Sequence, residues 1–248
     1  MFNRLKISIC IAALIALSGC ATATKDNPDP YEGYNRAIYS FNGYAYDYAV
    51  GPVADAYTFV LPTMFQHGVS NFFNNTFEIS HVVNDLLQFE FANAGKDASR
   101  FVLNTIFGVV GLFDVATTIG LEPRQQNFGL TMAKWGWEDS AYFVLPLAGP
   151  STVRDTLGVI PDAFMNPLLY ASTSIFLPGY NGGLISDGVS WGIFGVYAVS
   201  QASIFLPQME GLTEYAIDPY IAVRNAYLQY KDAQLHKLKD DKLVYQPN

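Results

Sequence analysis

Apolar residues recur at helical spacing along most of the chain, and no apolar–polar alternation of the kind that marks a strand persists for long. One apolar stripe covers 34–48. A second covers 79–87 and is entered after Asn75 and Thr76, which are plausible helix caps. Asp218-Pro219 places a capping residue before a proline at the first helical position, where proline is favoured. The pattern predicts a mainly α protein.

The expected helices are interrupted in a recurring way. Four bulky apolar triplets are each followed directly by proline, at 59–62, 143–146, 175–178 and 204–207. Because proline disfavours the α conformation in the residue before it, each triplet should end a helix and turn the chain. Gly51-Pro52 should stop the first helix in the same way. We therefore expect a single domain of many short, proline-broken amphipathic helices.

Residues 1–19 form a predicted signal peptide that is cleaved. Arg4 and Lys6 supply its positive start, and 7–17 is an apolar run of signal-peptide length. Residues 17–20 read L-S-G-C, which resembles the bacterial lipobox, whose cysteine is lipidated before cleavage. Acylation would hold Cys20 stably in a membrane, and Ala21 in the next position favours the outer membrane. The alternative is a buried cysteine behind an ordinary leader.

The mature chain divides by composition. Residues 20–30 form a lipidated N-terminus and polar tether, and 31–230 form the helical domain. Residues 231–248 form a charged C-terminal tail, which is typical of a solvated helix end or a disordered segment. Cys10 leaves with the leader and Cys20 is acylated, so no thiol remains for a disulfide or a metal.

Only 15% of the residues are charged, against about 25% in a typical soluble chain. The net charge of −8 argues against nucleic acid as a partner, because phosphate binding needs a basic surface. Between 163 and 209 the only charge is Asp187, and between 101 and 121 it is Asp114. Glycine and proline interrupt both segments, so we expect them to lie in a membrane interface instead of spanning a bilayer. The alternative is that both are core helices of a globular domain.

The chain carries no recognisable catalytic motif. Its histidines, His67, His81 and His236, include no two at metal-ligand spacing, and phosphate-binding glycine motifs are missing. Gly149-Pro150-Ser151 is followed by valine where a nucleophile elbow needs its second glycine. We therefore expect no enzyme activity, no cofactor and no metal. A membrane-anchored lipase stays as a minor alternative, for which the sequence offers Ser151 without a convincing histidine.

Six stretches of the mature chain carry a more specific pattern. They read D-P-Y-E-G-Y-N-R-A-I-Y-S-F-N at 29–42, N-D-L-L-Q at 84–88, R-F-V-L-N-T-I-F-G-V-V-G-L-F-D-V-A at 100–116, N-F-G with W-G at 127–129 and 135–136, Y-F-V-L-P-L-A-G-P-S-T-V-R-D at 142–155 and D-P-Y-I-A-V-R-N-A-Y at 218–227. Together and in this order they resemble the VacJ/MlaA family of outer-membrane phospholipid-transport lipoproteins. Two departures are N-F-G-L-T-M-A at 127–133, where the family usually has D-F-G-Q-T-L-G, and Phe89, where it often has glycine.

The resemblance implies a ring-like, α-helical protein that lies in the periplasmic leaflet of the outer membrane and offers a polar path. Such proteins are thought to take mislocalised phospholipids from the outer leaflet and pass them to a soluble periplasmic carrier, which maintains lipid asymmetry. They associate with trimeric porins. No bond is made or broken, which agrees with the lack of catalytic motifs. The alternative is a structural or porin-accessory lipoprotein without transport.

The candidate site residues are the lipid anchor Cys20 and ten polar residues within apolar surroundings. These ten are Asn35, Arg36, Asn42, Arg100, Asn104, Asp114, Arg154, Asp155, Asp187 and Arg224. Each could line a polar path or serve the structure. For all but Asp187 we favour a buried hydrogen bond or ion pair, because an unpaired buried charge is costly. Asp187 could face a cavity or cap the helix that follows it.

Overall fold

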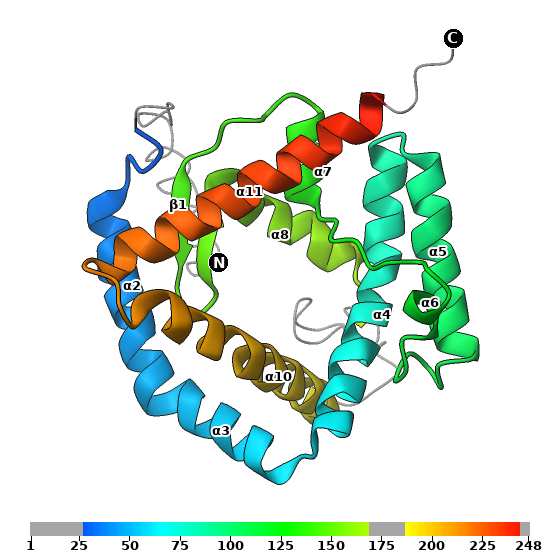
Figure 1. Ribbon diagram of the computed structural model, residues 1–248, viewed down its shortest axis with the longest axis horizontal. Helices are drawn as coiled ribbons and strands as arrows, with labels where there is room; N and C mark the ends of the chain where they lie inside the picture. The colour runs from blue at the N-terminus through cyan, green and yellow to red at the C-terminus, as the bar shows by residue number, and fades with distance from the viewer. Residues whose placement is uncertain (1–26, 169–186, 244–248) are drawn as a thin grey trace, which may run out of the picture.

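The computed structural model describes residues 27–168 and 187–243, and its elements follow one another around a ring (Figure 1). In chain order they are α2 (Glu32–Ala45), η1 (Tyr46–Val50), α3 (Gly51–Val60), α4 (Thr63–Leu87), α5 (Phe91–Ile106), α6 (Val115–Thr118), α7 (Phe128–Lys134), β1 (Tyr142–Leu145), β2 (Gly149–Thr152), α8 (Val153–Met165), α10 (Asp187–Thr213) and α11 (Pro219–Leu243). Helices α2 and α3 form one side of the ring, and α4 and α5 form the opposite side. Helix α10 lies along α3, and α11 crosses one face.

The mainly helical, ring-like fold expected from the sequence is confirmed, with one local exception. The triplet before Pro146 forms β1, which pairs antiparallel with β2, where a helix end had been predicted. Tyr142 and Val144 point inward and are fully buried, so two alternate positions of β1 supply core contacts. Four residues are too short a stretch for this alternation to stand out in the sequence.

Several helices are longer than the proline pattern predicts. The triplet before Pro62 does end α3, but Pro207 lies inside α10, which runs for 27 residues. Gly51-Pro52 does not end the first helix, because the π-helical turn η1 widens the backbone there and α3 continues. A Cβ atom on Gly51 would lie 2.6 Å from the Tyr46 carbonyl oxygen, so this turn requires glycine. The predicted break at 175–178 lies outside the described residues.

One predicted helix start is wrong, and another is confirmed. Asn75 and Thr76 lie within the 25-residue helix α4 and cap nothing. Helix α8 is capped by Thr152, whose side chain accepts a hydrogen bond from the Asp155 N–H. Helix α11 starts at Pro219 as predicted and continues to Leu243, so most of the charged tail belongs to it.

The core lies where the hairpin meets α2 and α11. Tyr142, Val144 and Tyr220 are its buried centre, and partly buried side chains such as Tyr39 and Tyr227 pack around them. Between α4 and α5 the buried side chains are instead mostly polar or charged: Asn75, Glu78, Ser80, Asn84, Asp85, Asn93, Asp97, Arg100 and Asn104. This half of the ring therefore depends on hydrogen bonds and ion pairs.

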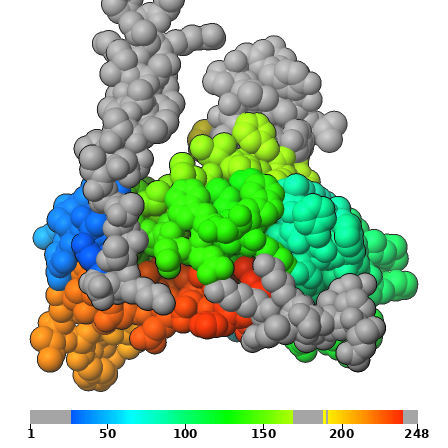
Figure 2. Space-filling view, turned by 90° about the horizontal axis from the view of Figure 1, so that it is seen from above, coloured from blue at the N-terminus to red at the C-terminus, as the bar shows by residue number. Residues whose placement is uncertain are grey.

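Large apolar side chains are exposed on several segments of the ring. They include Phe59 and Phe65 at the α3–α4 turn, Phe107, Val109 and Val110 after α5, Val159, Ile160 and Phe164 on α8, and Trp191 and Phe194 on α10. The end of α8 projects from the face opposite α11 (Figure 2). Within the described part of the low-charge segments these side chains do not form a core, which disfavours the globular-core alternative. No described helix is both long enough and apolar enough to cross a membrane.

Candidate functional site

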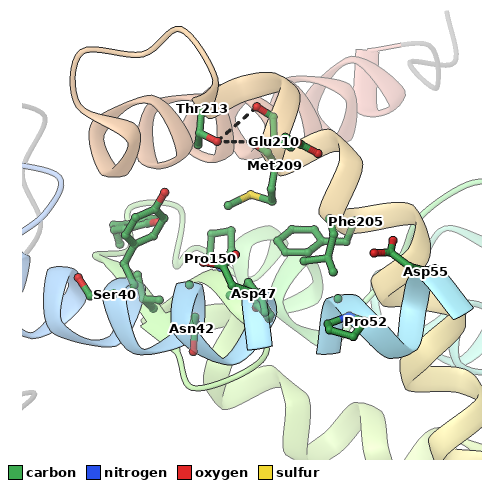
Figure 3. Close-up of a pocket in the computed structure, with 18 residues that line it drawn as sticks. Ser40, Asn42, Asp47, Pro52, Asp55, Pro150, Phe205, Met209, Glu210 and Thr213 are labelled. Atoms are coloured by element: carbon green, nitrogen blue, oxygen red, sulfur yellow. Dashed lines mark hydrogen bonds between the residues drawn. The ribbon is translucent and has the colours of Figure 1, made fainter. Parts of the chain in front are cut away.

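A cavity of about 540 Å³ lies between the α2–α3 side of the ring and the C-terminal half of α10 (Figure 3). The β1–β2 hairpin contributes a further wall through Tyr142, Val144, Gly149 and Pro150. The remaining lining residues are Tyr39, Ser40, Asn42, Gly43, Tyr46, Asp47, Gly51, Pro52, Asp55, Phe205, Leu206, Met209, Glu210 and Thr213. The cavity therefore joins three elements that are far apart in the sequence.

The lining combines negative charge with apolar surface. Asp47, Asp55 and Glu210 are exposed carboxylates, and no lysine or arginine is among the lining residues. Phe205 and Met209 supply apolar contact, and the Phe205 ring meets Tyr46 edge to face at 6.0 Å between centroids. Such a cavity suits an amphipathic ligand that has a polar or positively charged end.

Asn42, a predicted site residue, shapes the cavity through the hairpin turn. Its Nδ2 donates to the Leu145 carbonyl oxygen at 2.9 Å, and its Oδ1 accepts from the Leu147 N–H at 2.7 Å. The Tyr46 hydroxyl donates to the Leu147 carbonyl oxygen at 3.0 Å. Leu147 has φ = 62°, a strained value for a branched side chain, so these bonds hold a turn that would otherwise relax.

Asn35 and Arg224 belong to a second group, which we call the N-terminal clasp: Asp29, Asn35, Tyr220 and Arg224. Buried Asn35 donates to the Asp29 carboxylate at 2.8 Å and also pairs with the backbone of β1. Asp29 also accepts from the Tyr220 hydroxyl and, at 3.3 Å, from Arg224. Burial and the hydrogen bond to Asp29 raise the pKa of Tyr220, so its hydroxyl stays a donor. The clasp fixes the start of the domain to α11.

Arg36 lies on the surface beside the clasp. Its guanidinium pairs with Glu32 at 2.7 Å and with Asp218 at 2.8 Å, and it lies 4.4 Å from the centre of the Tyr220 ring. The hydrogen bond from Arg36 lowers the pKa of Asp218, which also accepts from the Ile221 N–H at the start of α11. These contacts join α2 to α11 outside the cavity.

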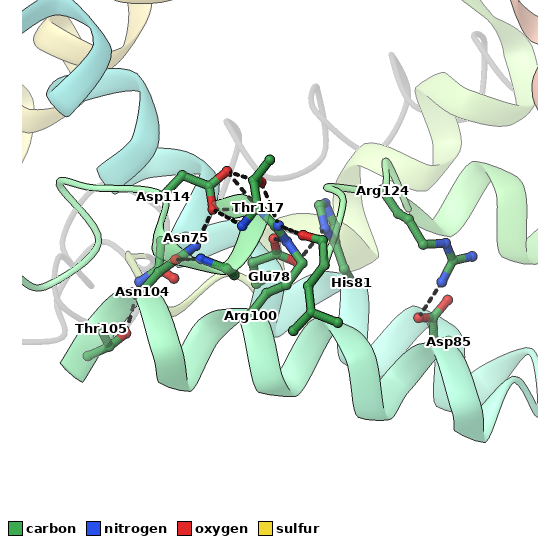
Figure 4. A network of polar contacts seen from close by, with 12 residues as sticks. Asn75, Glu78, His81, Asp85, Arg100, Asn104, Thr105, Asp114, Thr117 and Arg124 are labelled. Carbon is green, nitrogen blue, oxygen red and sulfur yellow. Dashed lines mark hydrogen bonds and ion pairs between the residues drawn. The ribbon is translucent and has the colours of Figure 1, made fainter. Parts of the chain in front are cut away.

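Arg100, Asn104 and Asp114 meet in one buried network between α5 and the following loop (Figure 4). Arg100 Nε pairs with Glu78 at 2.7 Å, and its other nitrogens contact the Asp114 carboxylate, the Thr117 hydroxyl and the Leu121 carbonyl oxygen. Asn104 donates to Asp114 at 3.0 Å and accepts from the Ala116 N–H.

Asp114 also caps α6, because its side chain accepts a hydrogen bond from the Thr117 N–H. Burial alone would raise the pKa of Asp114, but hydrogen bonds from Thr117 and Asn104 and the charge of Arg100 lower it. The network therefore fixes the loop between α5 and α6 against α4 and does not reach the cavity.

Arg154 and Asp155, at the start of α8, form a third group beside the middle of α11. Arg154 is 1% exposed and donates to the Trp137 and Glu138 carbonyl oxygens at 2.9 and 2.7 Å. Asp155 accepts from the Tyr227 hydroxyl at 3.1 Å and pairs with Lys231 at 2.8 Å. Arg154 Nε and Asp155 Oδ1 are 3.5 Å apart.

Two predicted residues cannot be placed by their contacts. Cys20 lies outside the described residues, and Asp187 is the first residue of α10 with its side chain outside them. Of the predicted polar residues, only Asn42 lines the cavity; the other described ones lie in the networks above.

One pattern in the sequence does mark the cavity wall, although the distribution of charged residues along the chain does not reveal it. Ser40, Gly43, Asp47, Gly51 and Asp55 recur every three or four residues and share one helix face, which the structure turns toward the cavity. Small and acidic residues at this spacing mark a helix face that leaves room.

The minor lipase alternative gains no geometric support. The Ser151 hydroxyl contacts the Thr152 carbonyl oxygen at 3.2 Å and the Thr156 hydroxyl at 3.0 Å. Among the described contacts, neither partner is a base of the kind that would activate a serine nucleophile. The described histidine, glutamate and aspartate ligand atoms come together once, at Glu78, His81 and Asp97.

Comparisons with known proteins agree with one another. The family model described as MlaA lipoprotein matches residues 27–234. The intermembrane phospholipid transport system lipoprotein MlaA of Escherichia coli is 34% identical over 238 residues, covering 92% of this chain and 88% of that protein. An uncharacterized protein of Rickettsia prowazekii is 32% identical over 222 residues, covering 89% and 80%.

A solved structure described as the structural basis for maintenance of bacterial outer membrane lipid asymmetry also matches. It aligns with a TM-score of 0.66 at 32% identity, and the alignment covers 82% of this chain and 97% of that one.

Proposed function

Because the chain belongs to the MlaA lipoprotein family, we propose that it is an outer-membrane lipoprotein of intermembrane phospholipid transport that maintains lipid asymmetry. The observation that carries this function is the agreement of the family match over 27–234 with a structural match that covers 97% of its neighbour. The protein removes mislocalised phospholipids from the outer leaflet and delivers them toward the periplasm. No chemical step is required of it.

The proposed location is the periplasmic leaflet of the outer membrane, with an acyl anchor on Cys20. The lipobox-like L-S-G-C at 17–20 supports the anchor. Exposed apolar side chains, among them Phe59 at 92% exposure, support contact of the ring itself with lipid, because contiguous apolar surface is rare on soluble monomers. A trimeric porin in the membrane and a soluble periplasmic phospholipid-binding carrier are the proposed partners.

Labelling with a palmitate analogue tests the anchor. The wild-type protein should be labelled in cells, and Cys20→Ala should lose the label because no other cysteine remains in the mature chain. Cys10→Ala is the matched control and should be labelled like the wild type. Equal labelling of the wild type and Cys20→Ala would contradict the anchor.

We propose that the cavity between α2–α3 and α10 holds the lipid headgroup while the acyl chains stay in the apolar phase. Its three carboxylates and lack of basic residues favour headgroups that carry an ammonium group, such as ethanolamine. Phe205 and Met209 offer contact to the glycerol and the first methylenes. A lipoprotein with a purely structural function would not require this cavity.

Gly43 is a position at which a larger side chain would fill part of the cavity. It lines the cavity from α2, and a Cβ atom on it would meet nothing within 4 Å. Gly43→Phe should therefore fold, fill part of the cavity and block the headgroup. Cells that express only this variant should accumulate outer-leaflet phospholipid to near the level of cells that lack the protein.

Two variants control for the substitution itself. Gly43→Ala leaves the cavity open and raises helix propensity by about 1 kcal/mol, so lipid asymmetry should stay normal. Gly33→Phe adds the same ring to α2 at a position that also has open space but does not line the cavity. Normal asymmetry with Gly43→Phe at normal protein level would place the path elsewhere or favour the structural alternative.

A further inference from the structure

A small group of potential metal ligands lies between α4 and α5, on the far side of the ring from the cavity. Glu78 and His81 are three residues apart on α4, and Asp97 faces them from α5. One ligand atom from each lies within 4.8 Å of the others. Glu78 is 3% exposed and Asp97 is fully buried, so the group is largely closed to water.

The contacts of Asp97 do not account for its burial. No donor group among the described residues hydrogen-bonds to the Asp97 carboxylate, and its hydrogen-bonding neighbour is another carboxyl group, that of Asp85. A buried carboxylate is stable only when it is protonated, paired or bound to a metal. Burial, followed by the negative charge of Glu78, raises the pKa of Asp97. Something other than the described hydrogen bonds must compensate this group.

The arginine side chains near this group already pair with other carboxylates. Arg100 pairs with Glu78 at 2.7 Å and with Asp114 at 3.2 Å, so one guanidinium faces two carboxylates. Arg124 pairs with Asp85 at 3.3 Å. Adding Asp97 gives this group an excess of negative charge, which a divalent cation would neutralise.

We propose that Glu78, His81 and Asp97 bind a divalent transition-metal cation such as Zn²⁺. Two carboxylates and an imidazole are a donor set that zinc accepts. His81 Nδ1 and Glu78 Oε2 are 3.4 Å apart, which is about the separation of two ligands in a tetrahedral site with bonds of about 2.1 Å. Asp97 needs only a small side-chain shift to complete three ligands.

The surroundings fit a structural role for the cation. Arg100 holds the other oxygen of Glu78 and so orients Oε2 toward His81, as outer partners of metal ligands commonly do. The cation would join α4 to α5 where apolar packing is sparse. The spacing of the histidines predicts no metal here, because the proposed site pairs one histidine, His81, with a glutamate, Glu78, and not with a second histidine.

The competing occupant of the site is a proton. In that arrangement Asp97 would share a proton with the neighbouring carboxyl group of Asp85. This arrangement would need no metal, and metal content and thermal unfolding distinguish it from the proposed site.

The test uses the full lipoprotein purified in detergent, stripped with a chelator and dialysed against zinc chloride. Wild-type protein should retain about one zinc ion per chain by mass spectrometry. Its Tm should rise by roughly 5–10 °C at a hundredfold excess over Kd. Asp97→Asn and His81→Gln should each lose both effects while keeping a helical circular dichroism spectrum.

Asp232→Asn controls for surface binding, since Asp232 and His236 form a similar but exposed pair at 3.4 Å. This variant should behave like the wild type. Zinc retention by Asp97→Asn and His81→Gln equal to that of the wild type would overturn the site. A wild-type protein that retains no zinc would overturn it as well, and a Tm that then rises in Asp97→Asn would show that a proton occupies the site.

Discussion

Replacing Arg100 with methionine should lower the free energy of unfolding by about 3–5 kcal/mol, because it leaves a buried carboxylate without its counter-charge. Arg100 is 3% exposed and pairs with Glu78, which is equally buried. Methionine keeps much of the side-chain volume, so the loss reports charge and hydrogen bonding more than a cavity. Urea unfolding in detergent, followed by circular dichroism, measures the difference.

Arg36→Met is the matched control. Arg36 also joins two carboxylates, Glu32 and Asp218, but all three side chains are 39–48% exposed. Surface pairs of this kind contribute little to stability because water screens both charges, so the control should stay near the wild type. Arg100→Lys should fall between the two, because a single ammonium cannot replace the guanidinium fork. Similar losses for Arg100→Met and Arg36→Met would show that the buried network does not stabilise the ring.

Replacing Asn35 with leucine should cost about 3 kcal/mol, because it leaves two backbone groups of the hairpin unpaired. Asn35 accepts from the Val144 N–H at 2.9 Å and donates to the Tyr142 carbonyl oxygen at 3.1 Å. It also contacts Asp29 in the N-terminal clasp. Leucine has the same branched arrangement of side-chain heavy atoms but can make none of these bonds. Urea unfolding again measures the effect.

The same substitution on the surface provides the comparison. Asn225 is exposed on α11, and Asn225→Leu should change stability by less than about 0.5 kcal/mol. Limited proteolysis adds a second readout, since loosening of the clasp in Asn35→Leu should expose the chain before α2. An Asn35→Leu protein as stable and as resistant as Asn225→Leu would refute the role given to the clasp.

The sequence predicts the parts of the fold that depend on neighbouring residues. Pro62 ends α3, and Asp218 directly precedes Pro219, the first residue of α11, because each of these effects acts within one helical turn. Gly51-Pro52 fails as a helix end because a π-helical turn, which needs its own hydrogen bonds, accommodates the proline.

Partners that are distant in sequence could not be predicted. The pattern singles out Asn35 and Arg100 as polar residues in apolar surroundings. However, Asn35 bonds to β1 across 107 residues, and Arg100 bonds to Glu78 on another helix. The periodicity of a single sequence does not indicate which residues from distant segments contact each other. The family resemblance predicts the function. The grouping of Asp47 and Asp55 with Glu210 around the cavity depends on the packing of α10 against the α2–α3 side, which the sequence does not reveal.

The N-terminal clasp limits how far the protein can travel. The clasp fixes the chain to α2 and α11 at Asp29, which follows the proposed anchor Cys20 by nine residues. Nine residues reach about 30 Å at full extension, less than the roughly 40 Å thickness of a bilayer with its headgroups. With the proposed anchor on Cys20, the ring would be able to tilt or slide on the membrane but not to carry cargo away from it. Any lipid it extracts must be collected at the membrane surface by a molecule that diffuses there.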